Sequence, residues 1–151
     1  MLTITPLSAH NPGPMTGDGN HTYLLGDDRG PALLVDAGVG DPRHLAELRT
    51  KLPSSRTVDV VVTHAHPDHA SGAPAVARAF PAARFFKWPW ADEDRKWAVP
   101  WHGPVDGQAI ACGTTDSVGP GGTSWSPMVT VTLAVAAARR LLVAVSCKTF
   151  S

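Results

Sequence analysis

Clusters of apolar residues divide most of the chain into short strands and helices. The run Val58–Val62 is almost entirely β-branched and lies between turn-forming residues, which is typical of a buried parallel strand. Other apolar runs predict further strands, and leucines at helical spacing predict a helix. The expected strands are residues 2–7, 23–25, 32–35 and 84–87, and the expected helices are residues 43–52 and 71–80. Strands that alternate with helices predict an α/β fold.

Composition places the chain among ordinary globular domains. Its 151 residues suffice for one domain with a core, 43% of them are hydrophobic, and 13 basic and 13 acidic residues leave no formal net charge. This balance argues against a strong electrostatic grip on nucleic acid, although a local basic patch is compatible with it. Arg139 and Arg140 interrupt the apolar C-terminal stretch, so we expect no membrane helix. Without a recognisable signal peptide, the expected location is cytoplasmic.

The candidate chemistry is concentrated in Thr63–His69, directly after the strand at 58–62. Three histidines and one aspartate fall within six positions, namely His64, His66, Asp68 and His69. Imidazole nitrogens and carboxylate oxygens are the ligands that zinc and similar divalent metals accept. Loops at the carboxyl ends of parallel strands are also where α/β sheets place their ligands. The sequence therefore predicts a metal site here rather than a loop of solvated histidines.

The spacing His-x-His-x-Asp-His resembles the metallo-β-lactamase superfamily of hydrolases, and other segments extend the resemblance. Asn20–Gly26 is similar to the opening of the lactamase-like branch, which includes endoribonucleases and thioesterases of polyketide pathways. Leu33–Gly38 resembles the second strand of the family, and Phe85–Trp90 resembles the stretch after its first helix. The similarity covers residues 1–112. It implies a metallo-β-lactamase αββα sandwich with only the N-terminal half present and the C-terminal half truncated or replaced.

The resemblance also implies a role for each residue of the candidate site. His64 and His66 would bind one zinc ion, and Asp68 and His69 a second. Asp68 would in addition orient or deprotonate the attacking water, and hydroxide on the metal would attack an ester, thioester or related bond. Asp36 would support the metal-binding loop from behind. A simple turn or helix-cap role for Asp36, at the end of its strand, is the alternative.

After residue 112 the sequence departs from the family pattern. No histidine follows His102, so the further ligands that the resemblance implies are missing, and residues 113–151 form a divergent tail. A shifted reading frame, an alternative splice or a genuine short paralogue would each explain the change, and its abruptness favours a frame or splice change. Within the tail, Val129–Leu133 predicts a replacement strand and Ala134–Val145 a short helix.

The leading functional hypothesis is a zinc-dependent hydrolase that acts on a small-molecule or carrier-bound acyl substrate. The absence of excess basic charge favours such a substrate over RNA. An endoribonuclease remains a further enzyme alternative. A catalytically inactive fragment, or a remnant that binds a partner, is the alternative from a different class, because ligands and half of the sandwich are missing. An exposed sheet edge would favour oligomerisation.

Two further groups of aromatic side chains have open roles. Four tryptophans follow the strand at 84–87, namely Trp88, Trp90, Trp97 and Trp101. They either seal the core or form an apolar wall beside the metal site, and the sequence leaves both interpretations open. His21 and His102 stand alone in the sequence, and we expect each to be structural or exposed rather than a ligand.

Overall fold

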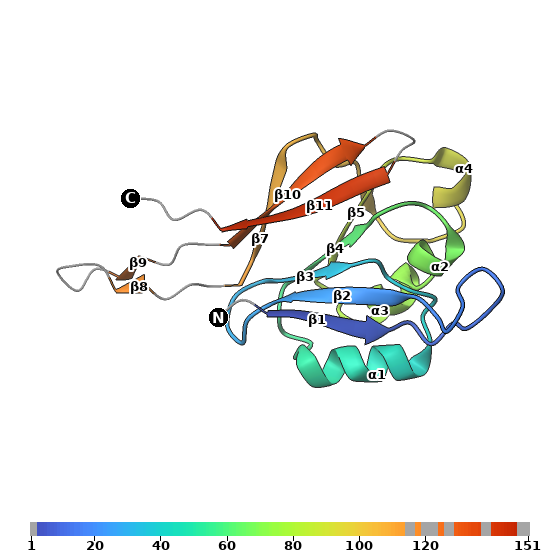
Figure 1. Cartoon of the computed structure of the whole chain (residues 1–151), viewed down its shortest axis with the longest axis horizontal. Helices are drawn as coiled ribbons and strands as arrows, with labels where there is room; N and C mark the ends of the chain where they lie inside the picture. Colours follow the sequence, from blue (N-terminus) through green and yellow to red (C-terminus); the bar gives the residue numbers. More distant parts are fainter. Residues whose placement is uncertain (1–2, 114–116, 119–123, 126–128, 137–139, 148–151) are drawn as a thin grey trace.

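In a computed structural model of the protein, a six-stranded sheet forms the centre of the fold (Figure 1). Its strand order is β1-β2-β3-β4-β5-β6. Its strands are β1 (Thr3–Ser8), β2 (His21–Gly26), β3 (Ala32–Val35), β4 (Val58–Val62), β5 (Arg84–Lys87) and β6 (Trp101–His102). The pairs from β1 to β3 are antiparallel, and the pairs from β3 to β6 are parallel. The structure describes residues 3–113 with their side chains and, beyond them, the backbone of residues 117–118, 124–125, 129–136 and 140–147.

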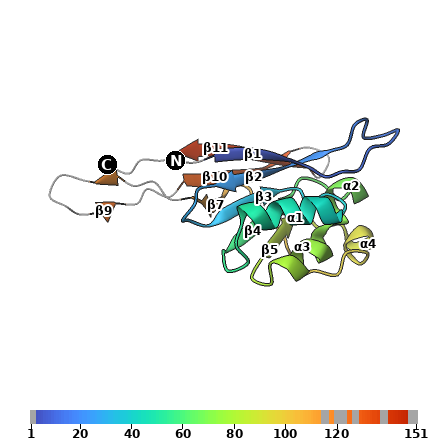
Figure 2. The same cartoon turned by 90° about the horizontal axis from the view of Figure 1, so that it is seen from below.

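Helices cover one face of this sheet (Figure 2). They are α1 (Pro42–Lys51), α2 (Pro67–Ala70), α3 (Ala73–Ala79) and the short α4 (Ala91–Asp94). Helix α1 begins at Pro42 because the side chain of Asp41 accepts a hydrogen bond from the backbone N–H of Arg43. Apolar residues of α1 and α3 pack on the sheet and form the main core, which includes Leu48, Val60, Val76, Phe80 and Phe85.

A second sheet lies on the opposite face of the first (Figures 1 and 2). Its strand order is β11-β10-β7, with β7 at Gln108–Cys112, β10 at Val129–Ala136 and β11 at Arg140–Cys147. Ile110 and Cys112 of β7 are buried with apolar residues of the first sheet, including Leu33, Val61 and Phe86. A separate pair of short strands, β8 (Ser117–Val118) and β9 (Ser124–Trp125), forms a two-stranded ribbon. Helices, sheet and second sheet thus build three layers of the expected αββα sandwich.

The helix predicted over Ala134–Val145 is wrong, because this stretch completes β10 and forms most of β11. The two strands pair antiparallel, with Val135 opposite Leu141 and Ala136 opposite Arg140. Alanine is the strongest helix former, but tertiary context overrides such propensities, and the valines of this stretch suit a strand that pairs along its length. The strand predicted over Val129–Leu133 is confirmed as part of β10, which also pairs with β7.

The remaining predicted elements are confirmed with small shifts. The strands at 58–62 and 84–87 have the predicted bounds, and the first helix is displaced by one residue. The helix expected over 71–80 corresponds to the shorter α3, and a separate short helix, α2, precedes it with Ser71 and Gly72 between them. Within the part of the chain that the structure describes, no helix is long and apolar enough to cross a membrane.

Candidate functional site

The histidine segment lies at the carboxyl ends of the parallel strands, where the sequence predicted it. Thr63–His66 forms the loop after β4, and α2 starts at Pro67. The segment after β3 reaches the same edge of the sheet, since the N–H of Asp36 donates to the carbonyl oxygen of Val61 over 2.9 Å. The N–H of Ala37 donates to the carbonyl oxygen of His69 over 2.8 Å. Backbone hydrogen bonds therefore hold the two segments together.

Asp36 connects these segments through its side chain. Its Oδ1 accepts hydrogen bonds from the backbone N–H and the hydroxyl of Thr63, at 2.8 and 2.9 Å. Its Oδ2 lies 2.8 Å from Nδ1 of His69. The residue is buried, with 6% of its surface exposed, and has a φ of 64°, a conformation that side chains other than glycine seldom adopt. Asp36 thus contacts both Thr63 and His69, and its role as a support for metal ligands stays a prediction.

The hydrogen bonds of Asp36 determine which nitrogen of each neighbouring ring carries a proton. A carboxylate only accepts hydrogen bonds, so Nδ1 of His69 is the donor, and in the neutral ring Nε2 then carries the lone pair. The Thr63 hydroxyl donates its proton to Asp36 and therefore accepts from Nδ1 of His64, 3.0 Å away. In the neutral form of both histidines Nε2 therefore carries the lone pair, and this is the form that binds metals.

The possible donor atoms meet in two pairs. Nε2 of His64 lies 3.1 Å from Nδ1 of His66, and Nε2 of His69 lies 3.4 Å from Oδ2 of Asp68. Two nitrogen ligands of one tetrahedral zinc ion, each bonded at about 2.0–2.1 Å, are about 3.3 Å apart. Both separations therefore fit donors that share a cation. Across residues 3–113 no group of three or more His, Cys, Asp or Glu side chains converges on a single ion position, so the arrangement is two pairs.

Asn20, at the junction of the β1–β2 loop and β2, also reaches this site and was missed by the sequence analysis. Its Nδ2 donates to Oδ2 of Asp68 over 2.6 Å and lies 3.5 Å from Nε2 of His69. Burial raises the pKa of the Asp68 carboxyl, but the hydrogen bond from Asn20 and the electrostatic interaction with His69 outweigh it, so the pKa is lowered. Only the fold brings together residues so distant in sequence, and no spacing pattern indicated this contact.

Close backbone packing supports the Asp36 segment from below. A Cβ atom at Gly72 would lie 2.2 Å from the carbonyl oxygen of Ala37, so only glycine fits at the α2–α3 junction.

His44 of α1 is fully buried near Gly38, and its Nε2 is 2.8 Å from Oγ1 of Thr22. Burial lowers the pKa of His44. Its Nδ1 has no hydrogen-bond partner among the described residues.

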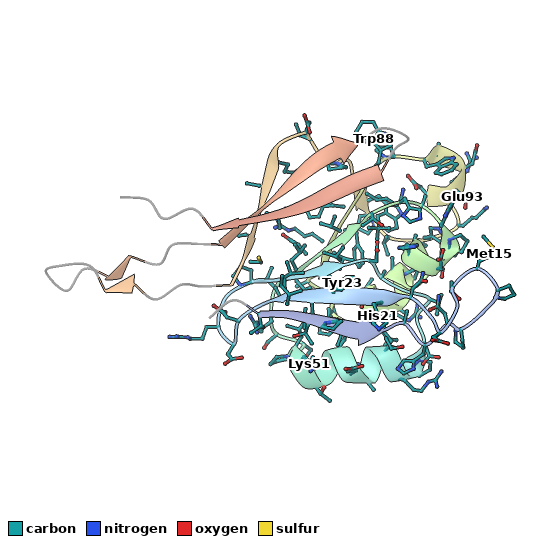
Figure 3. All side chains as sticks on the ribbon, viewed as in Figure 1. Met15, His21, Tyr23, Lys51, Trp88 and Glu93 are labelled. Carbon is teal, nitrogen blue, oxygen red and sulfur yellow. The ribbon has the colours of Figure 1, made fainter. Side chains whose placement is uncertain are left out.

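The tryptophans divide between the core and the surface. Trp97 and Trp101 pack against the main core, which is the structural role that the sequence left open. Trp90 is 38% exposed, and Trp88, which Figure 3 labels, is half-buried. Lys87 holds this segment, because its buried ammonium group pairs with Asp94, donates to the Trp88 carbonyl oxygen over 3.0 Å and lies 5.0 Å from the Trp101 ring centroid.

The two isolated histidines, His21 and His102, are exposed, as expected. Figure 3 labels His21, the first residue of β2. His102 lies at the end of β6, the edge strand, where its ring is 5.5 Å from that of Phe86. Neither residue contributes to the two donor pairs.

Similar proteins match the chain over part of their length. It is 39% identical over 72 residues to "Beta-lactamase-like protein 2 homolog" of Caenorhabditis elegans, which covers 46% of this chain and 24% of that protein. It is 36% identical over 81 residues to an atrochrysone carboxyl ACP thioesterase of Aspergillus novofumigatus, which covers 51% of this chain and 25% of that protein. The match thus spans about a quarter of the length of these relatives.

Solved structures share the fold at low sequence identity. A metallo-beta-lactamase from Staphylococcus aureus matches with a TM-score of 0.60 and 15% identity, over 96% of this chain and 37% of that chain. A flavo di-iron protein variant from Thermotoga maritima matches with a TM-score of 0.66 and 12% identity, over 95% and 37%. The sequence model of the metallo-beta-lactamase superfamily matches residues 15–131, which is most of the chain and extends past residue 112. The chain therefore belongs to the metallo-beta-lactamase superfamily.

Proposed function

We propose that the chain is part of a metal-dependent hydrolase in which His64, His66, Asp68 and His69 hold divalent cations, zinc in the first instance. The observation that carries the proposal is the hydrogen-bond network of Asp36. It orients His69 directly and His64 through Thr63, and it leaves Nε2 of both rings with a lone pair. A structural loop would have no need for a buried carboxylate that selects this form in two histidines.

The chemistry that such cations supply is Lewis acidity, which polarises a carbonyl group and makes water a stronger acid. Asp68 is the residue of this chain suited to orient the attacking water or accept its proton. Its side chain is 31% exposed, so water reaches it, and its lowered pKa keeps it ionised at neutral pH. Asp36 touches no reacting atom and acts by holding the rings of His69 and, through Thr63, His64 in place.

An ester or thioester of a small molecule or of an acyl carrier is the substrate class that we propose. Support comes from the thioesterase named among the relatives and from the absence of net charge, which gives no general attraction to RNA. Trp88 and Trp90 lie at the end of β5, the strand next to the one that leads into the histidine loop, and leave apolar surface accessible. An acyl group could pack there.

One observation favours the second candidate, a chain that is active only with further residues or a partner. Each donor pair supplies two side chains, whereas a catalytic zinc usually has three protein ligands. An additional chain could supply the missing ligand, and the edge strands β1 and β6 of the six-stranded sheet are places where it could add. On this alternative the isolated chain would bind cations weakly and turn over no substrate.

Hydrolysis of an acyl thioester of N-acetylcysteamine tests the proposal. We expect the zinc-loaded chain to cleave the thioester, chelation to stop cleavage, and His66→Ala to abolish it. His102→Ala removes an exposed histidine outside the site and serves as the control, with activity unchanged. Equal rates in the chain and in His66→Ala would contradict the proposal, and binding of zinc without any cleavage would favour the second candidate.

A further inference from the structure

The side chain of Asn20 lies across the second donor pair. Its Nδ2 is 2.6 Å from Oδ2 of Asp68 and 3.5 Å from Nε2 of His69. These two atoms are 3.4 Å apart, and both bring a lone pair to the same place. The amide N–H group of Asn20 therefore meets the two lone pairs that a cation would otherwise take.

The position of Asn20 is fixed by the loop before β2. Its N–H donates to Oδ1 of Asn11 over 2.8 Å, and its carbonyl oxygen accepts from the N–H of Ala9 over 2.8 Å. Oγ1 of Thr16 donates to the carbonyl oxygen of Asn11 over 2.5 Å, which closes the loop. A Cβ atom at Gly19 would lie 3.3 Å from the backbone nitrogen of Asn11, so the two ends of the loop are in close contact. The carboxamide is therefore held at the site from outside α2.

A carboxamide can present either of two groups to the same point. Its NH₂ group donates hydrogen bonds and its oxygen accepts them or binds a cation, and a half-turn about the last side-chain bond exchanges the two. Facing a carboxylate and an imidazole lone pair alone, the NH₂ group is favoured. Facing a cation between those groups, the oxygen is favoured, because only the oxygen offers a lone pair to the ion and amide or carbonyl oxygens bind divalent cations such as Ca²⁺, Mg²⁺ and Mn²⁺.

We propose that Asn20 is a third protein ligand of the cation held by Asp68 and His69, turning its amide oxygen toward the ion on binding. This inference rests on the proposed metal site and deepens it. It gives the second site three donors, an imidazole nitrogen, a carboxylate oxygen and an amide oxygen, all from described residues. It also assigns a purpose to the loop before β2, which would place a ligand on the opposite side of the site from α2.

Zinc affinity of the full chain in a His66→Ala background tests this inference, because the remaining cation then reports on Asp68 and His69. Competition with a chromophoric chelator gives the dissociation constant without any enzymatic assay. We expect Asn20→Ala to weaken binding about tenfold or more, within the range seen when a metal site loses a supporting group. Asn20→Asp keeps an oxygen at the same reach and is expected to bind zinc at least as tightly as the parent.

A matched control separates a direct ligand from a general effect of charge. Met15 is 96% exposed at the tip of the same loop, so Met15→Asp adds the same negative charge away from the donor atoms (Figure 3). It should leave the dissociation constant unchanged. Thermal unfolding of the metal-free variants checks that each one folds, and if Asn20→Asp fails to fold, Asn20→Ala and Asn20→Ser still give the comparison.

The outcomes distinguish this inference from the proposed function. An Asn20→Ala variant that binds zinc as tightly as its parent would overturn the ligand role. An Asn20→Asp variant as weak as Asn20→Ala would also overturn it, because the N–H group would then be what matters. If the His66→Ala chain with Asn20 intact binds no zinc, whereas the unaltered chain does, the site at Asp68 and His69 fails and the ligand role of Asn20 fails with it. If neither binds zinc, the proposed function fails with it.

Discussion

Asp36, directly after β3, and His69, in α2, meet through a 2.8 Å hydrogen bond between Oδ2 and Nδ1. The same carboxylate holds Thr63, which in turn accepts a hydrogen bond from His64. One buried side chain therefore sets the orientation of two rings in the histidine loop. The left-handed backbone of Asp36 is the cost of this placement, and the tight contact at Gly72 keeps it in position.

Replacement of Asp36 by asparagine should weaken zinc binding without unfolding the chain. The amide has a similar shape and tolerates the left-handed conformation, but its NH₂ group would face Nδ1 of His69 and favour the proton on the wrong nitrogen. We expect zinc affinity to fall about 10–100-fold in Asp36→Asn, as measured by chelator competition. Asp28→Asn, an exposed change on the β2–β3 turn, should have no effect. Unaltered affinity in Asp36→Asn would show that the network does not prepare the rings for metal.

The buried His44 should make the chain less stable in acid. Because burial lowers the pKa of His44 in the folded state, the unfolded chain takes up a proton first as the pH falls. The stability that neutral His44 contributes is complete above its ordinary value of 6.5 and is lost as the pH drops from there toward the folded-state pKa. The loss is limited to about 1.4 kcal/mol per pH unit.

A variant that does not titrate isolates this effect from the other histidines. His44→Gln retains a polar group that reaches Thr22, so its free energy of unfolding in urea should depend less on pH below 6.5 than that of the parent. Both chains are compared without metal, which removes the contribution of the candidate ligands. Parallel pH profiles for the two chains would exclude His44 as a source of acid sensitivity.

The ion pair between Asp59 and Arg84 should stabilise the fold mainly by supplying hydrogen bonds to a buried carboxylate, and less by the attraction between the two charges. Asp59, the second residue of β4, is 2% exposed, and Nε and Nη2 of Arg84 donate to its two oxygens over 2.7 and 2.6 Å. Arg84→Met leaves a buried carboxylate without this partner, and we expect a loss of about 1–3 kcal/mol in the free energy of unfolding. Adding Asp59→Val removes the orphaned charge and should restore most of the loss. A double variant no more stable than Arg84→Met would contradict this explanation.

The sequence predicts the centre of the fold well because its signals there are strong and local. The β-branched run of β4 cannot easily be anything but a buried strand, and Asp41-Pro42 marks the start of α1. The β10–β11 hairpin was mistaken in part for a helix, because alanine, valine and leucine suit either structure until a partner strand is known. Asn20 could not be found at all, since its contact with Asp68 links residues 48 positions apart and depends on the packing of the loop.

The candidate site shows the same division. His64, His66, Asp68 and His69 stand out in the sequence because they are dense and follow a strand, and the structure brings their donor atoms into pairs. Their assignment as metal ligands stays a prediction, as does the boundary at residue 112 between the family-like part and the tail. The sequence could not predict that Thr63 links Asp36 to His64 by hydrogen bonds, because a single threonine belongs to no recognisable ligand motif.

The number of zinc ions bound per chain tests the central claim most directly. The full chain is dialysed against buffered zinc, and bound metal is measured beside His66→Ala, Asp68→Ala and the double variant of the two. We predict that the parent binds zinc, that each single variant loses part of it, and that the double variant binds none. Zinc retained in full by the double variant, or absent from the parent, would contradict the metal site on which the proposed hydrolase depends.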